Sequence, residues 1–289
     1  MNYRHHFHAG NFADVMKHAL LVQLVRALQR KEKGFLFLDT HAGRGSYDLT
    51  AAARGDTLAR QPEWPEGIGR LWGADLGPGP LDDYVTAVRQ FDHDRGNRDA
   101  LPHYYPGSPQ IAKLLARPQD RIALCEMHPE EYAALADELQ YAPHTTVHEM
   151  DGYTAVKAML PPRERRALVL IDPPYEEQVE FERIAAALRD GIARLAGGTF
   201  AVWYPLTERA RVDAFFTELQ ALRLPPTLAA ELTIAGELSP LKMRGCGLLV
   251  VNPPWQFDGV AKNLLQDLAG RLEQEPGANA RIDWIVAES

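Results

Sequence analysis

This chain of 289 residues has little cysteine, no long apolar run and no excess of positive charge. Its two cysteines, Cys125 and Cys246, each lie inside an apolar segment. We therefore expect neither a disulfide framework nor a zinc site with cysteine spacing, and a reducing compartment is favoured. No apolar run approaches the roughly 18 residues that a membrane-crossing helix needs. These absences predict a cytoplasmic protein that does not bind a membrane.

The charge balance argues against one further class of protein. A net charge of -8 does not suit a protein that coats nucleic acid through charge alone, although it leaves room for a local basic face. The length suits one large domain with an insertion, or two small domains. A solvated surface charge remains the simpler interpretation of each basic candidate for such a face. These candidates are Arg163, Arg165, Arg166, Lys242 and Arg244.

Short apolar segments that end in an acid recur along the chain, at residues 35–39, 122–126, 145–151 and 167–172. Helical patterns lie between several of them, and Ser108 is expected to cap one of these helices. Strands that alternate with helices predict a mainly parallel, doubly wound sheet. In such sheets, ligands bind beyond the carboxyl ends of the strands. Three later strands are expected at residues 199–204, 227–234 and 248–252.

Residues 172–175 carry the most informative motif, Asp-Pro-Pro-Tyr, directly after the apolar run at residues 167–171. Two successive prolines remove two backbone donors, so the sheet cannot simply continue and the carbonyl groups turn outward as acceptors. Asp172 adds another acceptor and Tyr175 adds a flat apolar face. This set suits a planar ligand that bears an amino group, although an ordinary proline-rich strand exit is the alternative interpretation.

Other strand ends carry groups that suit a nucleoside cofactor. The glycine-containing loop at residues 39–45 lacks the third glycine of a dinucleotide fingerprint, which favours contact with a smaller cofactor, or a plain turn. Glu126 can accept hydrogen bonds from ribose hydroxyl groups, or can simply end a strand in solvent. Asp151 can accept one from an adenine amino group, with Gly152 leaving space for the ring, or both can form a turn.

Two further features invite a functional interpretation and favour a structural one. Residues 252–255 repeat the motif loosely as Asn-Pro-Pro-Trp, but they follow a strand that comes after the complete motif. We expect a structural role there. His5, His6, His8 and His18 suggest a metal site. No carboxylate or thiol has suitable spacing, so we expect no bound metal and prefer a segment that helps to close the cofactor and nucleic-acid site.

The N-terminal segment carries an unusual signature. It comprises Tyr3, Arg4, His5, Phe7, His8, Ala9, Gly10, Asn11, Ala13, Asp14, Val15, Lys17 and His18. This signature resembles that of the RlmJ family of bacterial large-subunit ribosomal RNA adenine-N6 methyltransferases. Matching stretches continue at residues 38–43, 104–109, 151–152, 170–175, 203–205, 252–255 and 284–286. The resemblance therefore spans essentially the whole chain.

This resemblance implies a Rossmann-like class I methyltransferase that depends on S-adenosylmethionine, with a seven-stranded, mainly parallel sheet and a small helical insertion. We expect the methyltransferase domain at residues 1–45 and 106–289 and the insertion at residues 46–105. The implied substrate is one adenine of 23S ribosomal RNA or of a ribosomal precursor, and no protein partner is implied. The implied site residues are Asp172, Pro173 and Tyr175 for catalysis, His18, His41, Ser108, Glu126, Asp151, Gly152 and Asp172 for the cofactor, and Tyr3 and Lys17 for RNA.

Other functions share parts of this pattern. The short motif also occurs in enzymes that methylate adenine in DNA, cytosine N4 or a protein glutamine. A noncatalytic RNA-binding assembly factor can retain the fold, but the intact set of acids argues against it. A nicotinamide oxidoreductase is disfavoured because the glycine fingerprint is incomplete.

Overall fold

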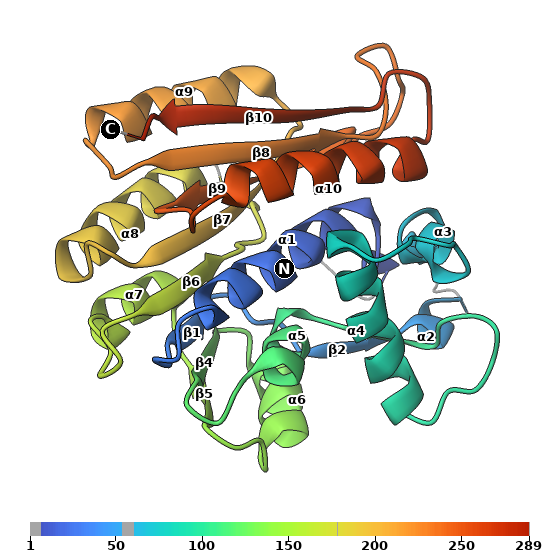
Figure 1. Ribbon diagram of the computed structural model, residues 1–289, viewed down its shortest axis with the longest axis horizontal. Helices are drawn as coiled ribbons and strands as arrows, with labels where there is room; N and C mark the ends of the chain where they lie inside the picture. The colour runs from blue at the N-terminus through green and yellow to red at the C-terminus, as the bar shows by residue number, and fades with distance from the viewer. Residues whose placement is uncertain (1–6, 54–60, 178, 289) are drawn as a thin grey trace.

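The computed structural model describes residues 7–53, 61–177 and 179–288. Its centre is an eight-stranded sheet with the order β10-β8-β9-β7-β6-β1-β4-β5 (Figure 1). The five strands from β7 to β5 in this order are all parallel, and β9, β8 and β10 extend the sheet in antiparallel pairs. The strands are β1 (Leu36–Asp39), β4 (Arg121–Glu126), β5 (Thr145–Glu149), β6 (Ala167–Ile171), β7 (Thr199–Pro205), β8 (Thr227–Thr233), β9 (Gly245–Val251) and β10 (Asn279–Val286).

The predicted fold class is confirmed, with one strand more than the seven expected. The additional strand is β10, which pairs with β8 at the edge of the sheet. Its sequence mixes polar and apolar residues and its side chains are only partly buried, so it lacks the apolar run that marks the inner strands. Such a pattern is common in edge strands, which have a neighbour on one side only.

Helices cover both faces of the sheet, and the inner strands are therefore apolar on both sides. In β6, Leu168 and Leu170 face the core formed with α1, α5 and α10, whereas Val169 and Ile171 face the core formed with α7, α8 and α9. The covering helices are α1 (Phe12–Gln29), α5 (Ser108–Leu115), α6 (Pro129–Leu139), α7 (Gly152–Met159), α8 (Glu180–Arg194), α9 (Arg209–Ala221) and α10 (Phe257–Leu272).

Helix α1 is buried on nearly every side, because it packs against α5, α10 and α4 (Pro80–Asp94) as well as the sheet. Asn11 caps it, since its side-chain oxygen accepts hydrogen bonds from the backbone of Ala13 and Asp14, both at 3.0 Å. Helical spacing then brings Asp14, Lys17 and His18 to one region near the carboxyl edge of the sheet. Helix α1 therefore contributes polar side chains to the carboxyl edge of the sheet, although its sequence pattern is mainly that of an apolar helix.

Over residues 46–105 the chain leaves the main sheet, and it returns to the sheet afterwards. The segment opens with β2 (Ser46–Asp48), which pairs in antiparallel fashion with β3 (Tyr104–Pro106) where the chain returns. Between them lie α2 (Leu49–Ala53), η2 (Trp64–Glu66), α3 (Ile68–Trp72) and α4. The backbone N–H of Ile68 donates to the carbonyl of Gly10 at 2.8 Å, which ties the segment to the entry of α1. The division into two domains stays a prediction.

Candidate active site

A large cleft of about 1410 Å³ lies at the carboxyl edge of the parallel strands. It brings together every described residue that the sequence analysis assigned to catalysis, cofactor or RNA. Tyr3 lies outside the described residues. The assigned residues that line the cleft are Lys17, His18, His41, Ser108, Glu126, Asp151, Gly152, Asp172, Pro173 and Tyr175.

The Asp-Pro-Pro-Tyr motif leaves β6 directly into the cleft. Tyr175 has a φ of 52°, in the left-handed region, so the chain turns sharply there. Its hydroxyl group donates to the backbone carbonyl of Trp203 at 2.6 Å, and its ring contacts Phe181 and Trp203 at centroid distances of 5.3 and 5.8 Å. Burial raises the pKa of the Tyr175 hydroxyl well above its usual value. The ring is therefore held in place by β7 and α8.

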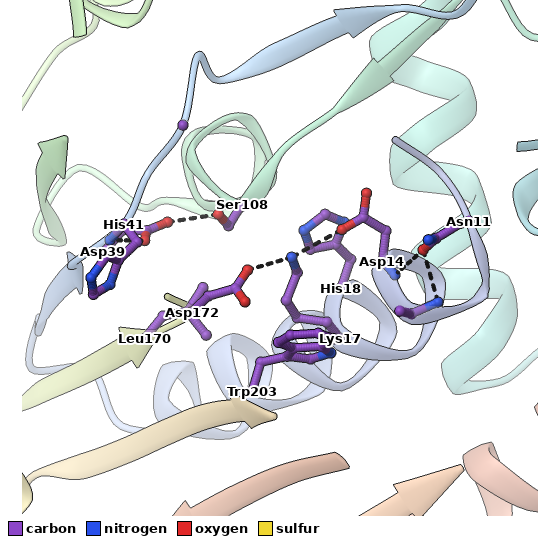
Figure 2. A network of polar contacts seen from close by, with 12 residues as sticks. Asn11, Asp14, Lys17, His18, Asp39, His41, Ser108, Leu170, Asp172 and Trp203 are labelled. Carbon is purple, nitrogen blue, oxygen red and sulfur yellow. Dashed lines mark hydrogen bonds and ion pairs between the residues drawn. The ribbon is translucent and has the colours of Figure 1, made fainter. Parts of the chain in front are cut away.

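Figure 2 shows Lys17 between the carboxylates of Asp14 and Asp172. Its Nζ lies 2.5 Å from Asp172 Oδ2 and 2.9 Å from Asp14 Oδ1, and only 7% of the side chain is exposed. Burial acts to lower the pKa of Lys17, but the two carboxylates outweigh it and raise that pKa well above the usual value. Lys17 is thus charged and pairs with Asp172. Its assignment to RNA stays a prediction, and the contact with Asp172 was not expected from the sequence.

Asp39 is a second buried acid at this edge that the sequence analysis did not assign to the site. It is fully buried at the end of β1, where its Oδ2 accepts a hydrogen bond from the Ser108 hydroxyl group at 2.6 Å (Figure 2). Ser108 begins α5 and directs its hydroxyl group to Asp39, so it does not cap the helix as expected. Burial raises the pKa of Asp39 to about 7, partly offset by the Ser108 hydrogen bond.

The raised pKa of Asp39 predicts a pH-dependent stability. Between about pH 4 and about pH 7 the folded protein keeps a proton that the unfolded chain, with an aspartate pKa of about 3.9, has released. The contribution of Asp39 to stability is therefore expected to fall as pH rises through this window, by at most about 4 kcal/mol. Asp39→Asn should remove this dependence and unfold at higher urea concentration than the wild type at pH 8. Parallel curves of unfolding free energy against pH would contradict the assignment.

The acids that end the next two strands are held by backbone and side-chain donors. Glu126 accepts hydrogen bonds from the backbone of Gly43 at 2.9 Å and of His128 at 2.7 Å, one on each oxygen. Because a carboxylate oxygen has two acceptor positions, Glu126 keeps capacity for a ligand. Asp151 accepts from the Thr154 backbone at 2.7 Å and from Arg183 at 2.9 Å. Both carboxylates are therefore oriented before any ligand arrives.

Gly152 is required for a different reason from the one expected. A Cβ atom at this position would lie 2.0 Å from the carbonyl oxygen of Thr40. The glycine therefore allows the loop after β1 to approach the start of α7, and the space it leaves is taken by backbone. Its assignment to the cofactor site stays a prediction.

A model of the family described as ribosomal RNA large subunit methyltransferase D, RlmJ, matches residues 32–286. The chain belongs to this family. Proteins named ribosomal RNA large subunit methyltransferase J from Escherichia coli (strain K12) and Haemophilus influenzae (strain ATCC 51907 / DSM 11121 / KW20 / Rd) are each 38% identical over 288 residues, with 100% of both chains covered. A crystal structure of a Legionella pneumophila str. Philadelphia 1 protein matches with a TM-score of 0.85 and 34% identity, covering 96% of this chain and 98% of the other.

Membership of the RlmJ family confirms the resemblance seen in the sequence. The second proline motif has the structural role expected of it. Because β9 runs antiparallel to β7, Asn252 lies at the opposite edge of the sheet from Asp172. Its side-chain amide donates to the carbonyl groups of Ala196 at 2.8 Å and Gly198 at 2.9 Å, which closes the loop before β7.

In the part of the chain that the structure describes, no group of three or more histidine, cysteine, aspartate or glutamate side chains is arranged to hold a metal ion. His5 and His6 lie outside that part. Among the same residues, no helix combines the length and the apolar character needed to span a bilayer.

His18 is linked to the segment 46–105 through two buried tyrosines. Its Nδ1 lies 2.8 Å from the hydroxyl oxygen of Tyr105, which lies 2.8 Å from that of Tyr84 in α4. All three side chains are at most 2% exposed. The two tyrosine hydroxyl groups thus fix the ring of His18, which the RlmJ resemblance assigns to the cofactor.

His41 is another histidine of the cleft. Burial lowers its pKa to about 4, so it is neutral at neutral pH.

A pair of tyrosine variants tests the link between His18 and the two buried tyrosines. Tyr105→Phe removes the hydroxyl group that lies between His18 and Tyr84. We therefore expect the KM for S-adenosylmethionine to rise roughly tenfold, as for one lost buried hydrogen bond, with a smaller change in kcat. Tyr84→Phe keeps the contact between Tyr105 and His18 and serves as the matched control. Steady-state kinetics at saturating RNA gives both values. Equal KM values for the two variants would show that the tyrosines serve the core alone.

Proposed function

We propose that this protein transfers a methyl group from S-adenosylmethionine to the exocyclic N6 of an adenine in 23S ribosomal RNA. The observation that carries the proposal is the position of Asp172, Pro173 and Tyr175. They face the same cleft as Glu126 and Asp151. A site for a flat, amino-bearing base is therefore continuous with a set of acids that suits a nucleoside cofactor. The names of the relatives in Escherichia coli and Haemophilus influenzae agree with this substrate.

The residues of the cleft fit the cofactor chemically. Glu126 has acceptor capacity for the ribose hydroxyl groups. Asp151 is oriented by Arg183 and Thr154 to accept from an adenine amino group. Asp172 adds a carboxyl group to the same cleft, which suits a ligand that carries positive charge on sulfur and on its amino group. When bound, this cofactor supplies an electrophilic methyl group on a sulfonium.

The chain's own groups prepare the accepting amine. Adenine N6 is a poor nucleophile, because its lone pair is delocalised into the ring. Acceptors at Asp172 and the Pro173 carbonyl can hold its two hydrogens and favour a nucleophilic geometry. Lys17 pairs with Asp172 through Oδ2 and so orients the carboxyl group, while Oδ1 accepts no hydrogen bond from the residues that the structure describes. The ring of Tyr175 offers a face for the flipped base, and the proton leaves after methyl transfer.

The cleft is also large enough for two ligands. Small-molecule sites usually enclose roughly 300 to 1,000 Å³, whereas this one encloses about 1410 Å³. A cofactor and a flipped base together account for such a volume better than a single small molecule. A ribosomal RNA substrate fits the cytoplasmic location expected from the sequence.

A substrate comparison tests the proposal. The purified protein is incubated with labelled S-adenosylmethionine and, separately, with unmodified 23S ribosomal RNA, duplex DNA or a glutamine-containing protein fraction. Nucleoside digestion and mass spectrometry then identify the product. We expect N6-methyladenosine in the RNA alone. Label in cytosine, DNA or protein would assign a different methyltransferase, and RNA binding without transfer would assign a noncatalytic assembly factor.

A further inference from the structure

The cleft extends past Asp172 to the half of the sheet that carries none of the predicted cofactor residues. On one side of β6, the strands β1, β4 and β5 present the cofactor acids, and on the other side lie β7, β9 and β8. Because Gly245 pairs with Thr233 and Cys246 pairs with Pro205, the loop between β8 and β9 lies at the same edge as the end of β7. This β8–β9 loop, residues 234–244, contributes Ile234, Leu241, Lys242 and Met243 to the cleft.

The β8–β9 loop is held in place at both ends. The backbone of Ile234 donates to the carbonyl of Arg244 at 2.8 Å, and Gly236 donates to the carbonyl of Pro276 at 3.1 Å. Leu241 and Met243 are partly buried and pack against the hydrophobic core, whereas Lys242 between them is exposed. The loop therefore presents one cationic side chain to the cleft from a fixed backbone.

Charge is distributed unevenly along the cleft. Its cofactor end carries Glu126, Glu130, Glu131 and Asp151, and Arg44 there is paired with Glu131 at 2.8 Å. Lys17 in the middle is paired with two acids. At the far end lie Lys242 and the exposed Arg211 of α9, with Glu208 as the carboxylate nearby in sequence. Lys242 has no hydrogen bond or ion pair within the described part of the chain, so its charge is uncompensated.

We propose that the β8–β9 loop, through Lys242, binds the phosphate backbone of the RNA beside the target adenine, with Arg211 on the same side of the cleft. This inference rests on the proposed function. A base that enters the cleft next to Tyr175 brings its flanking phosphates to the rim, where Lys242 offers a positive charge although the net charge of the chain is -8. A lysine suits this contact, because it binds phosphate as a point charge without reading sequence.

The charges around the cleft also indicate on which side of the target base the RNA strand runs. The segment 46–105 lines another part of the cleft, away from the loop after β1. Its described residues there include two acids and no cation: Gln61, Pro62, Glu63 and Glu66. Glu63 already accepts hydrogen bonds from His8 at 2.9 Å and Asn11 at 2.8 Å, so it anchors the entry to α1. The RNA strand next to the target base is therefore expected to follow the β8–β9 loop.

The test compares lysine variants in RNA binding. For Lys242→Ala we expect roughly threefold to tenfold weaker binding to an unmodified 23S ribosomal RNA transcript. Its plot of log affinity against log salt should be less steep by about 0.7 to 0.9, as for the loss of one phosphate contact. Lys242→Arg should retain both values, and the affinity for S-adenosylmethionine should not change. Lys262→Ala, at an exposed position of α10 that does not line the cleft, is the matched control.

The outcomes separate this inference from the proposed function. If the wild type methylates the transcript and Lys242→Ala binds RNA with the same affinity and salt slope as Lys262→Ala, the inference is overturned and the proposed function stands. If the wild type binds S-adenosylmethionine but methylates no 23S ribosomal RNA, the proposed function fails and the inference falls with it. Loss of RNA affinity confined to Lys242→Ala, with rescue by arginine, supports the inference.

Discussion

Asp172→Asn is expected to lower kcat by roughly 10³-fold, within the range of a lost acid–base or hydrogen-bonding group in catalysis. The asparagine keeps the shape but replaces one of the two oxygens with an NH2 donor, so it cannot offer an acceptor both at the position that faces Lys17 and at the position that faces the adenine amine. The fold should survive, because Lys17 still pairs with Asp14 at 2.9 Å. Single-turnover methylation of 23S ribosomal RNA measures the loss, and urea unfolding verifies the fold.

The second proline motif supplies the matched control for this variant. Asn252→Gly retains the left-handed backbone, where φ is 51°, but removes the two hydrogen bonds to Ala196 and Gly198. We expect reduced stability with kcat unchanged. A folded Asp172→Asn variant with undiminished kcat would refute the catalytic role of Asp172.

Lys17→Met is expected to impair both stability and activity. The substitution keeps most of the apolar volume but leaves Asp14 and Asp172 without their shared cation, where their side chains are only 4% and 17% exposed. Breaking a buried pair in this way costs about 3–5 kcal/mol, a large part of the usual stability of a domain. Activity should fall as well, because Asp172 loses the cation that orients its carboxyl group. Urea unfolding and single-turnover methylation of 23S ribosomal RNA measure the two effects.

A double-mutant cycle isolates the contact between Lys17 and Asp172. In the Asp172→Asn background, Lys17→Met leaves only Asp14 unpaired, so its cost in unfolding free energy should be smaller than in the wild type by 1 kcal/mol or more, on the order of couplings between contacting residues. Equal costs in the two backgrounds would mean that the ion pair contributes nothing to stability.

Local patterns were sufficient to predict the fold class and the position of the cleft. An apolar run followed by Asp-Pro-Pro-Tyr predicts a buried strand and its exit, and the acids that end β1, β4 and β6 meet at one edge because parallel strands end together. The edge strand β10 escaped prediction, because its half-buried sequence resembles a surface segment. Inner strands are buried on both faces, so their own residues form recognisable apolar runs, whereas those of an edge strand such as β10 do not.

The contacts within the site could not be predicted from local sequence patterns. Lys17 and Asp172 are 155 positions apart, and nothing local in α1 shows that a lysine in its second turn faces β6. Asp14 fitted the role of an ordinary first-turn acid, and Ser108 that of a helix cap. Only the packing of α1 and α5 on the sheet shows that Asp14 pairs with Lys17 and that Ser108 donates to Asp39.

The most direct measurement follows methyl transfer from labelled S-adenosylmethionine to unmodified 23S ribosomal RNA and maps the product by nuclease digestion and nucleoside mass spectrometry. The account predicts N6-methyladenosine at one position, approaching one methyl group for each RNA molecule and absent with Asp172→Asn. No transfer by a protein that binds the cofactor, or label on another base, would contradict it.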